Sequence, residues 1–358
     1  MSHRLRVLVA GMVAGDPHQG GAAWAVLQYV LGLKRLGHEV QLIESVNDPS
    51  EETRAYFDAV IKSFGLNGEL MTEARPLRDF DVVLNISGML AAETIESIPR
   101  RVYLDLDPAF NQLWQEEGID RGLDGHTHFV TLGQAIGRAE CKVPTHGRSW
   151  IPTLPPVVLE AWPCADGIAT NALTTVGNFR SYGSIDRDGV HYGQKVHSLR
   201  MLIGLPQKTR ERFVLAMAVH PDEQRDLAAL AENGWELVDP VVAAGTPEAY
   251  QEFVRGSRGE IGIAKSGYVV SRCGWFSDRS ACYLASGRPV VAQDTGFSSF
   301  LPVGEGLLAF DDEDGAVAAI EELGRDYPRH AIAARELAKK YFDSDRVLTS
   351  MLERLASW

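Results

Sequence analysis

The residues best suited to chemistry lie in one stretch, Ser271–Gly296, where a polar turn containing glycine precedes a predicted helix that begins at Asp278. Ser277 or Asp278 can cap this helix, and the amides just after the cap then have no partner inside the helix. Such amides, at the positive end of a helix dipole, suit a phosphate. Arg272 and Arg279 flank the turn and can add charge-assisted bonds to a diphosphate. The competing interpretation is an ordinary turn between a strand and a capped helix.

The same stretch resembles the donor-binding box of the GT-B glycosyltransferases. Cys273-Gly-Trp-Phe-Ser277, followed by Gly287-Arg-Pro-Val-Val, is similar to the run His-Cys-Gly-Trp-Asn-Ser and the later Gly-x-Pro of the plant secondary-product enzymes. Two features depart from that pattern. Arg272 replaces the phosphate-binding His, and two extra residues precede Gly-x-Pro. The acidic residue that contacts the ribose in the family falls on Cys282, which leaves Asp278 and Ser280 as the nearest substitutes.

The resemblance implies a nucleotide-sugar donor, UDP-glucose or a similar compound, bound by the second half of the chain, with no cofactor and no metal. Retaining members of the superfamily place an Arg and a Lys near the start of the second domain, and Arg180 and Lys195 occupy comparable positions. Asp294 resembles the start of the Asp-x-Gly turn that faces the donor sugar, although a simple turn closed by Gly296 explains it equally. The residues expected at the donor are Arg180, Lys195, Arg272, Gly274, Ser277, Asp278, Arg279, Ser280, Asp294, Thr295 and Gly296.

A second candidate site follows the first predicted strand, at the edge where ligands bind in open α/β sheets. The loop Asp16-Pro-His-Gln-Gly-Gly21 and the later Leu36-Gly-His-Glu-Val40 are similar to the N-terminal pattern of many GT-B transferases. In inverting members a His on this loop deprotonates the acceptor hydroxyl, and His18 occupies a suitable position. Asp16 is the alternative base, or the partner that orients His18. The competing interpretation is a surface loop without a role.

The acceptor is expected against Gly20 and Gly21, where backbone can approach a sugar closely, and against Asp105 and Asp107. Alternation along the strand places both carboxylates on one face at its carboxyl end, where they can bind acceptor hydroxyls or supply a base. Helix capping by Asp107 ahead of Pro108 is the competing explanation. A metal site is less favoured, because no further acidic or His ligand accompanies the pair locally.

Alternating strands and helices in both halves of the chain position these residues. Strands are predicted at 6–10, 39–43, 81–86, 101–106, 128–132, 173–179, 213–219, 235–238, 260–264, 289–292 and 306–310. Helices are predicted at about 22–36, 51–64, 108–117, 195–203, 223–232, 247–254, 278–285, 313–323 and 328–358, with a break near 343–345 and a short helix after Gly133. Gly37 and Gly287 are expected to end helices, and the Pro-rich passage Trp150–Pro163 to link two domains.

The resulting fold class is α/β, and the resemblance implies GT-B: two facing Rossmann-like domains, a cleft between them, and a C-terminal helix that crosses back to the first domain. The expected units are an acceptor-binding domain at 1–162, a nucleotide-sugar-binding domain at 163–340 and the crossing helix at 341–358.

Composition limits the classes of partner. The chain has 358 residues, 45% of them hydrophobic and 23% charged, which is typical of a globular protein. A net charge of −13 argues against a nucleic-acid partner. No apolar run approaches the roughly 20 residues of a membrane span, and the N-terminal run is too short for a signal peptide. Four cysteines without Cys-x-x-Cys spacing indicate reduced thiols and a cytoplasmic location.

These features together predict a metal-independent glycosyltransferase that moves a hexose from a nucleotide diphosphate sugar to a hydroxyl of a small molecule, such as a natural product or a nucleoside. Two alternatives stay open. One is a nucleotide-sugar epimerase of the same fold, and the other is a two-lobed sugar- or nucleotide-binding protein without catalysis.

Overall fold

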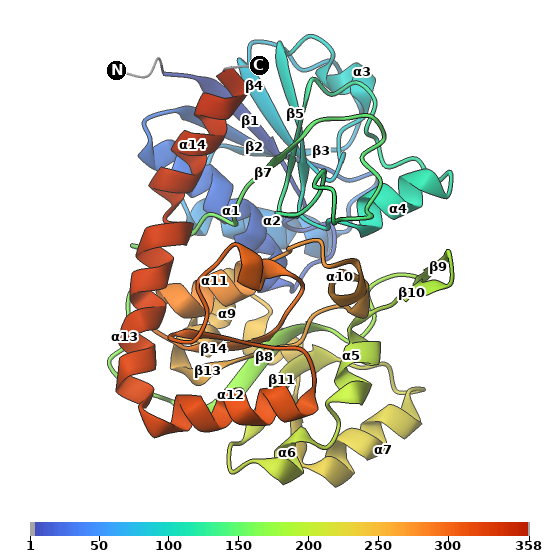
Figure 1. Ribbon diagram of the computed structural model, residues 1–358. Helices are drawn as coiled ribbons and strands as arrows, with labels where there is room; N and C mark the ends of the chain where they lie inside the picture. The colour runs from blue at the N-terminus through green and yellow to red at the C-terminus, as the bar shows by residue number, and fades with distance from the viewer. Residues whose placement is uncertain (1–3, 357–358) are drawn as a thin grey trace.

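The computed structural model describes residues 4–356, which form two α/β domains that face one another (Figure 1). Within these residues the first sheet has seven parallel strands in the order β3-β2-β1-β4-β5-β6-β7. Its strands are β1 (Arg6–Ala10), β2 (Glu39–Ser45), β3 (Gly68–Met71), β4 (Val82–Ile86), β5 (Arg100–Asp105), β6 (His128–Thr131) and β7 (Trp150–Pro152).

The second sheet has six parallel strands in the described chain, in the order β12-β11-β8-β13-β14-β15. They are β8 (Thr170–Asn178), β11 (Phe213–Ala218), β12 (Trp235–Val238), β13 (Ser257–Gly262), β14 (Val290–Gln293) and β15 (Leu307–Phe310). An antiparallel hairpin, β9 (Ile185–Arg187) and β10 (Val190–Tyr192), projects beside this sheet. In each domain the strand order reverses between the first and fourth strands, and in open α/β sheets ligands bind at that point.

Helices cover both sheets. In the first domain they are α1 (Gly20–Arg35), α2 (Glu51–Ser63), α3 (Ala92–Ile95) and α4 (Phe110–Glu116). In the second they are α5 (Lys195–Met201), α6 (Leu205–Lys208), α7 (Gln224–Asn233), α8 (Pro240–Ala244), α9 (Pro247–Gly256), α10 (Ser266–Ser271), α11 (Asp278–Ala285) and α12 (Glu313–Arg325). The chain then runs through α13 (Tyr327–Leu337), a π-helical segment (Ala338–Phe342) and α14 (Ser344–Ala356).

The alternation of strand and helix is confirmed, and three details differ from the sequence predictions. No helix follows Gly133; the chain forms turns there. Trp150 begins edge strand β7 instead of a linker, because its backbone continues the first sheet beside β6. Short elements without a clear apolar period (β3, α3, α6, α8, α10 and the hairpin) were not predicted. Gly37 and Gly287 do end helices, with φ of 86° and 67°.

Helix α1 lies between the two domains and is apolar on most of its surface, so one hydrophobic cluster continues from the first domain into the second. The Trp24 indole packs edge-on against Trp162 and donates to the carbonyl of Pro247 at 2.8 Å. The Tyr56 hydroxyl from α2 donates to the carbonyl of Gly245 at 2.9 Å. Apolar burial of this kind is the main favourable term in association, and it holds the domains together along α1.

The C-terminal helix crosses back onto the first domain, as the fold prediction requires (Figure 1). Gly32 of α1 lets α14 approach closely, because a Cβ there would lie 2.5 Å from Leu348 Cδ1. Arg35 pairs with Asp345 at 3.1 Å, and Arg354 donates to the carbonyl of Pro152 in β7. The second domain is therefore fixed to the first through α14 as well as through α1.

We expect Gly20→Ala to destabilise the protein by about 1–3 kcal/mol, the usual range for overpacking. A Cβ at Gly20 would lie 2.1 Å from the carbonyl oxygen of Thr246, and backbone cannot rotate away as a side chain can. Urea denaturation measures the change. Gly324→Ala is the control, because nothing lies within 4 Å of its Cβ, and it should be neutral or slightly stabilising. Equal stabilities for the two variants would contradict this account of the interface.

Candidate functional site

A cavity of about 200 Å³ lies between the domains, where the start of α1 meets the carboxyl end of β8 and the start of α11. The first domain contributes His18, Gln19, Gly21, Ala22 and Ala25, and the second contributes Val176, Gly177, Asn178, Pro240, Ala244, Tyr250, Asp278 and Arg279. The cavity thus brings both candidate regions of the sequence together. Its volume lies below the roughly 300–1,000 Å³ of ordinary ligand pockets, so a ligand of ordinary size would fit only if the domains separated.

His18 is the imidazole at this cavity, and its partner is Glu52 at the start of α2. His18 Nε2 lies 2.8 Å from Glu52 Oε1, and the ring packs edge-on against Tyr56. The imidazole is 39% exposed, so a ligand can reach it. Asp16 does not orient His18: its carboxylate accepts from the side chain of Gln19. The structure therefore gives His18 a carboxylate partner that the sequence did not indicate.

The loop that presents His18 is held by a buried carboxylate. Glu44, at the end of β2, accepts from the amides of Val13, Ala14 and Gly15 at 2.6–3.0 Å. Burial raises the pKa of Glu44, while these three donors oppose the rise. Glu44 fixes the shape of the loop, and no motif in the sequence pointed to it.

Lys195 lies behind the wall of the cavity at Gly177. A Cβ at residue 177 would lie 3.2 Å from Lys195 Nζ and 3.9 Å from Arg279 Nη1, so the missing side chain leaves two cations close to the cavity wall. The buried Lys195 ammonium donates to the carbonyl of Ile263 at 2.9 Å. Burial lowers its pKa well below the usual value, and the nearby Arg279 guanidinium adds to that effect. A bound anion would relieve both penalties.

Arg279 is committed to a buried ion pair with Glu260 of β13 and also donates to the carbonyl of Val176. Its neighbour Asp278 lines the cavity, and burial raises the pKa of that carboxyl while Arg279 opposes the rise. Arg279 therefore stabilises the carboxyl edge of β8 and offers a ligand only the part of its charge that Glu260 leaves uncompensated.

The corner ahead of Ser280, which the sequence predicts as the phosphate site, is almost filled. Ser277 and Ser280 are buried, the space beside them is about 10 Å³, and the Ser277 side chain makes no capping bond. A loop of the first domain covers the turn, since the amide of Ala135 donates to the carbonyl of Cys273 at 2.9 Å. Gly274, with φ of 76°, lies against this loop. The open space lies instead on the Asp278 side of α11.

The other predicted donor residues lie apart from the cavity. Arg180 pairs with Glu223, and Arg272 pairs with Asp294 at 3.1 Å. Asp294 also accepts from the amides of Gly296 and Ser298, so it closes the turn that the sequence left as an alternative. The remaining member of that turn, Thr295, is buried, and its hydroxyl donates to the carbonyl of Trp275.

Cys282, at the family's ribose position, is buried under α1. The side-chain amide of Gln28 donates to its sulfur at 3.6 Å, and burial raises the pKa of the thiol. Gly20 and Gly21 also serve the contact between domains: a Cβ on Gly21 would lie 2.9 Å from the Tyr250 ring. Cys282 and Gly20 therefore face protein in this arrangement, whereas Gly21 lies at the edge of the cavity.

The two carboxylates of the Asp105-Leu-Asp107 run face different partners. Asp105 is fully buried and accepts from Asn111 and Gln112, both at 2.7 Å, and from Thr131 at 2.8 Å. Asp107 instead reaches the second domain, where it contacts Lys265 and two tyrosines. Among the described residues, no group of three acidic, His or Cys side chains is arranged to hold a metal.

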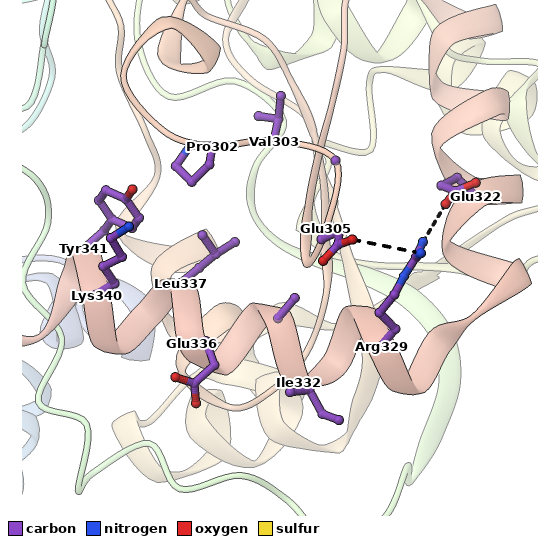
Figure 2. Close-up of a pocket in the computed structure, with 12 residues that line it drawn as sticks. Pro302, Val303, Glu305, Glu322, Arg329, Ile332, Glu336, Leu337, Lys340 and Tyr341 are labelled. Carbon is purple, nitrogen blue, oxygen red and sulfur yellow. Dashed lines mark hydrogen bonds and ion pairs between the residues drawn. The ribbon is translucent and has the colours of Figure 1, made fainter.

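A larger hollow, of about 1060 Å³, follows the outer side of α13 (Figure 2). Three of its charged side chains pair with one another, since Arg329 contacts both Glu322 and Glu305. It contains none of the residues that the sequence selected, and only the second domain and its following helix line it. We therefore assign the site to the smaller cavity between the domains.

No helix in residues 4–356 is long and apolar enough to cross a membrane.

No family model matches the sequence, and no curated protein matches it. Several solved structures have a similar fold. The Anabaena protein HepE, in complex with UDP and glucose, is 12% identical with a TM-score of 0.61, over 99% of this chain and 100% of its own. An α-glucosyltransferase in complex with UDP and a 13-mer DNA is 12% identical with a TM-score of 0.63, over 99% and 100%. WaaG, a glycosyltransferase of lipopolysaccharide biosynthesis, is 10% identical with a TM-score of 0.50, over 98% and 99%.

These similarities extend over nearly the whole chain, so they concern both domains and their arrangement. The fold is GT-B, which confirms the fold class that the sequence predicts.

We expect Asp105 to make stability depend on pH. Burial raises the pKa of Asp105 to about 6, above the usual value of about 4. The folded state then binds its proton more tightly than the unfolded chain does. The stabilisation of the folded state by the protonated Asp105 carboxyl is therefore fully present at acidic pH. It is lost as the pH rises to about 6, and the free energy of unfolding falls by at most about 1.4 kcal/mol per pH unit.

The measurement is the free energy of unfolding of the wild type and Asp105→Asn at about pH 4 and about pH 7. The wild-type value should fall relative to that of the variant as the pH rises. Asp222→Asn, at an exposed position, is the control and should show no such trend. A constant difference between wild type and Asp105→Asn would show that this carboxyl does not bind protons differently on folding.

Proposed function

We propose that this protein is a glycosyltransferase that moves a sugar from a nucleotide diphosphate sugar, with UDP the favoured nucleotide, to a hydroxyl of a small-molecule acceptor. The observation that carries the proposal is the cavity between the domains, which has His18 on one wall and Lys195 behind the other. The GT-B fold supports it, because the solved proteins named above include two glycosyltransferases, and HepE and the α-glucosyltransferase have UDP bound. The acceptor class stays a prediction.

In this proposal the second domain holds the donor. The diphosphate lies at the carboxyl end of β8, where Gly177 allows the backbone to approach it and Lys195 supplies positive charge. When the sugar leaves, negative charge develops on the β-phosphate oxygen, and a preorganised ammonium in a site of low dielectric stabilises that charge more than water does. Cys282 stands where the family has an acidic residue that contacts the ribose. In this proposal Asp278 of α11, which lines the cavity, takes over that contact.

His18 and Glu52 supply the base. His18 takes the proton of the acceptor hydroxyl, the oxygen forms a bond to the anomeric carbon, and the bond from that carbon to the diphosphate breaks. Glu52 accepts a hydrogen bond from the imidazole and stabilises the charge that it gains. A base of this kind favours direct displacement, which inverts the anomeric configuration. Closure of the domains along α1 would exclude water that hydrolyses the donor.

The first test is nucleotide binding. At a UDP concentration of about 100 times the dissociation constant, the protein should gain about 2.7 kcal/mol of stability, read as a thermal shift. Lys195→Met keeps the buried stem and removes the charge, so it should lose most of this shift. Lys208→Met is the control, because Lys208 is exposed and pairs with Glu313 on α12. If UDP and the other nucleoside diphosphates leave the melting temperature unchanged, the proposed function is wrong.

The second test separates the base from the donor site. His18→Ala should keep the UDP shift and lower turnover of donor by about 10²–10⁴-fold, the usual contribution of a general base. Glu52→Gln should lower turnover less, because the amide still accepts a bond from the ring. Glu51→Gln, one residue earlier on the same helix and outside the pair, is the control. Normal turnover by His18→Ala would rule out His18 as the base.

The same assay decides between the proposal and its alternatives. A glycosyltransferase consumes donor and forms a glycoside when an acceptor is present. An epimerase interconverts sugar nucleotides without an acceptor, and a binding protein consumes nothing.

A further inference from the structure

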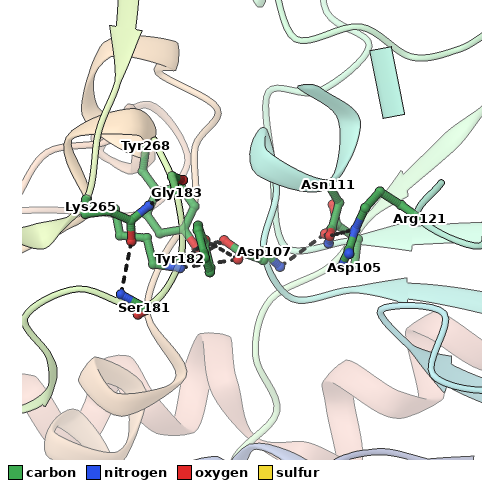
Figure 3. A network of polar contacts seen from close by, with 10 residues as sticks. Asp105, Asp107, Asn111, Arg121, Ser181, Tyr182, Gly183, Lys265 and Tyr268 are labelled. Atoms are coloured by element: carbon green, nitrogen blue, oxygen red, sulfur yellow. Dashed lines mark hydrogen bonds and ion pairs between the residues drawn. The ribbon is translucent and has the colours of Figure 1, made fainter. Parts of the chain in front are cut away.

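Three donors of the second domain converge on one carboxylate of the first domain (Figure 3), and none of these residues lines the cavity described above. Lys265 Nζ lies 3.2 Å from Asp107 Oδ2 and 3.4 Å from Oδ1. The phenol hydroxyls of Tyr182 and Tyr268 both donate to the same carboxylate. Lys265 follows β13, Tyr182 follows β8, and Tyr268 lies on α10, so these donors come from the carboxyl edge of one sheet.

Aromatic rings surround the ammonium. Lys265 Nζ lies 4.0 Å from the centroid of the Tyr182 ring and 5.3 Å from that of Phe110. Trp114 packs edge-on against Tyr182, with centroids 4.5 Å apart. Desolvation makes each charge-assisted bond in such a site stronger than in water. Asp107 is the carboxylate that pairs with Lys265 among the described residues, and a buried cation without an anion is strongly unfavourable.

The loop behind Tyr182 is braced from within the second domain. The side-chain carbonyl of Gln194 accepts from the amide of Ser181, and its side-chain amide donates to the carbonyl of Gly183. Gln194 itself caps α5. The loop that carries Tyr182 is therefore held by its own domain, whereas the carboxylate comes from the facing one. The side chains of Lys265 and Asp107 are 17% and 21% exposed, so water reaches the contact.

We propose that Lys265, Tyr182 and Tyr268 form a binding site for the phosphate or carboxylate group of a substrate, and that Asp107 occupies this oxyanion cradle until the substrate displaces it. One ammonium and two hydroxyls directed at one point match the charge and the acceptor oxygens of such a group. That the anion belongs to a substrate rests on the proposed function, whereas the binding of an oxyanion by these three residues does not. In this proposal the Asp107 carboxylate is a ligand that a substrate anion can replace, and the contact is not a permanent interdomain ion pair.

The test uses inorganic phosphate as the probe and thermal shift as the readout. Asp107→Ala removes the internal competitor, so this variant should bind phosphate at least about ten-fold more tightly than the wild type, which corresponds to about 1.4 kcal/mol. The double variant Asp107→Ala/Lys265→Ala should lose that gain. If Asp107→Ala responds to phosphate as the wild type does, or if the double variant keeps the gain, the cradle does not bind oxyanions and the contact is only an interdomain ion pair.

A second pair of variants keeps the test decisive if Asp107→Ala does not fold. Asp107→Asn is isosteric and uncharged, and we expect the same gain in phosphate binding. If Asp107→Asn responds to phosphate as the wild type does, the cradle does not bind oxyanions. Tyr182→Phe in the Asp107→Asn background removes one hydroxyl and keeps the aromatic packing. It should weaken phosphate binding, whereas unchanged binding would remove Tyr182 from the site.

The source of the oxyanion follows from titrations of UDP and uridine against wild type and Lys265→Ala. If Lys265→Ala weakens UDP but not uridine, the cradle binds the donor diphosphate. If it weakens neither, while Asp107→Ala still gains phosphate binding, the cradle binds an anionic acceptor. A protein that binds phosphate in the cradle and no nucleoside diphosphate contradicts the proposed function alone. A protein that binds UDP and shows no gain in Asp107→Ala contradicts the cradle alone.

Discussion

The packing of helix α1 between the two domains is the constraint on which the rest of the structure depends. Its glycine-rich start touches the backbone of the α8–α9 turn, its middle covers Cys282 on α11, and its end carries α14. The contact is apolar and continuous, and the space left between the domains is about 200 Å³. Any ligand as large as a nucleotide sugar must work against this packing, so its binding free energy includes the cost of partial opening.

Electrostatics then decides which cations the proposed diphosphate could use. Arg180, Arg272 and Arg279 each have a carboxylate partner, and a ligand that takes one of them must compete with that partner. Lys265 likewise pairs with Asp107. Lys195 is different, because its hydrogen-bond acceptor in the described chain is a backbone carbonyl and burial lowers its pKa well below the usual value. An anion would therefore gain most at Lys195, where it would remove part of the desolvation penalty of the buried ammonium.

The sequence predicts the fold well, because alternating apolar strands and amphipathic helices are local patterns that a parallel sheet requires. Helix α11 and strand β14 were predicted almost residue by residue, since a Gly stop and a buried run mark their ends. The site was harder to predict because its contacts join distant segments. Glu52 lies 34 positions from His18, and Asp107 lies 158 positions from Lys265. The hydrophobic periodicity of a sequence does not indicate pairs between distant segments. Tyr182 and Lys265 also lie beside short elements that show no hydrophobic periodicity.

The two kinds of contact between the domains differ in what can replace them. Along α1 the contact is apolar, and only another apolar surface can substitute for it when it separates. At Asp107 the contact is polar and partly open to solvent, and any oxyanion of suitable size can take the place of the carboxylate. Opening on the Asp107 side would exchange one ionic contact for another, but it would also separate Phe110 from the rings of Tyr182 and Tyr268. A ligand that enters from the side of the tyrosines must therefore replace an aromatic contact as well as a carboxylate.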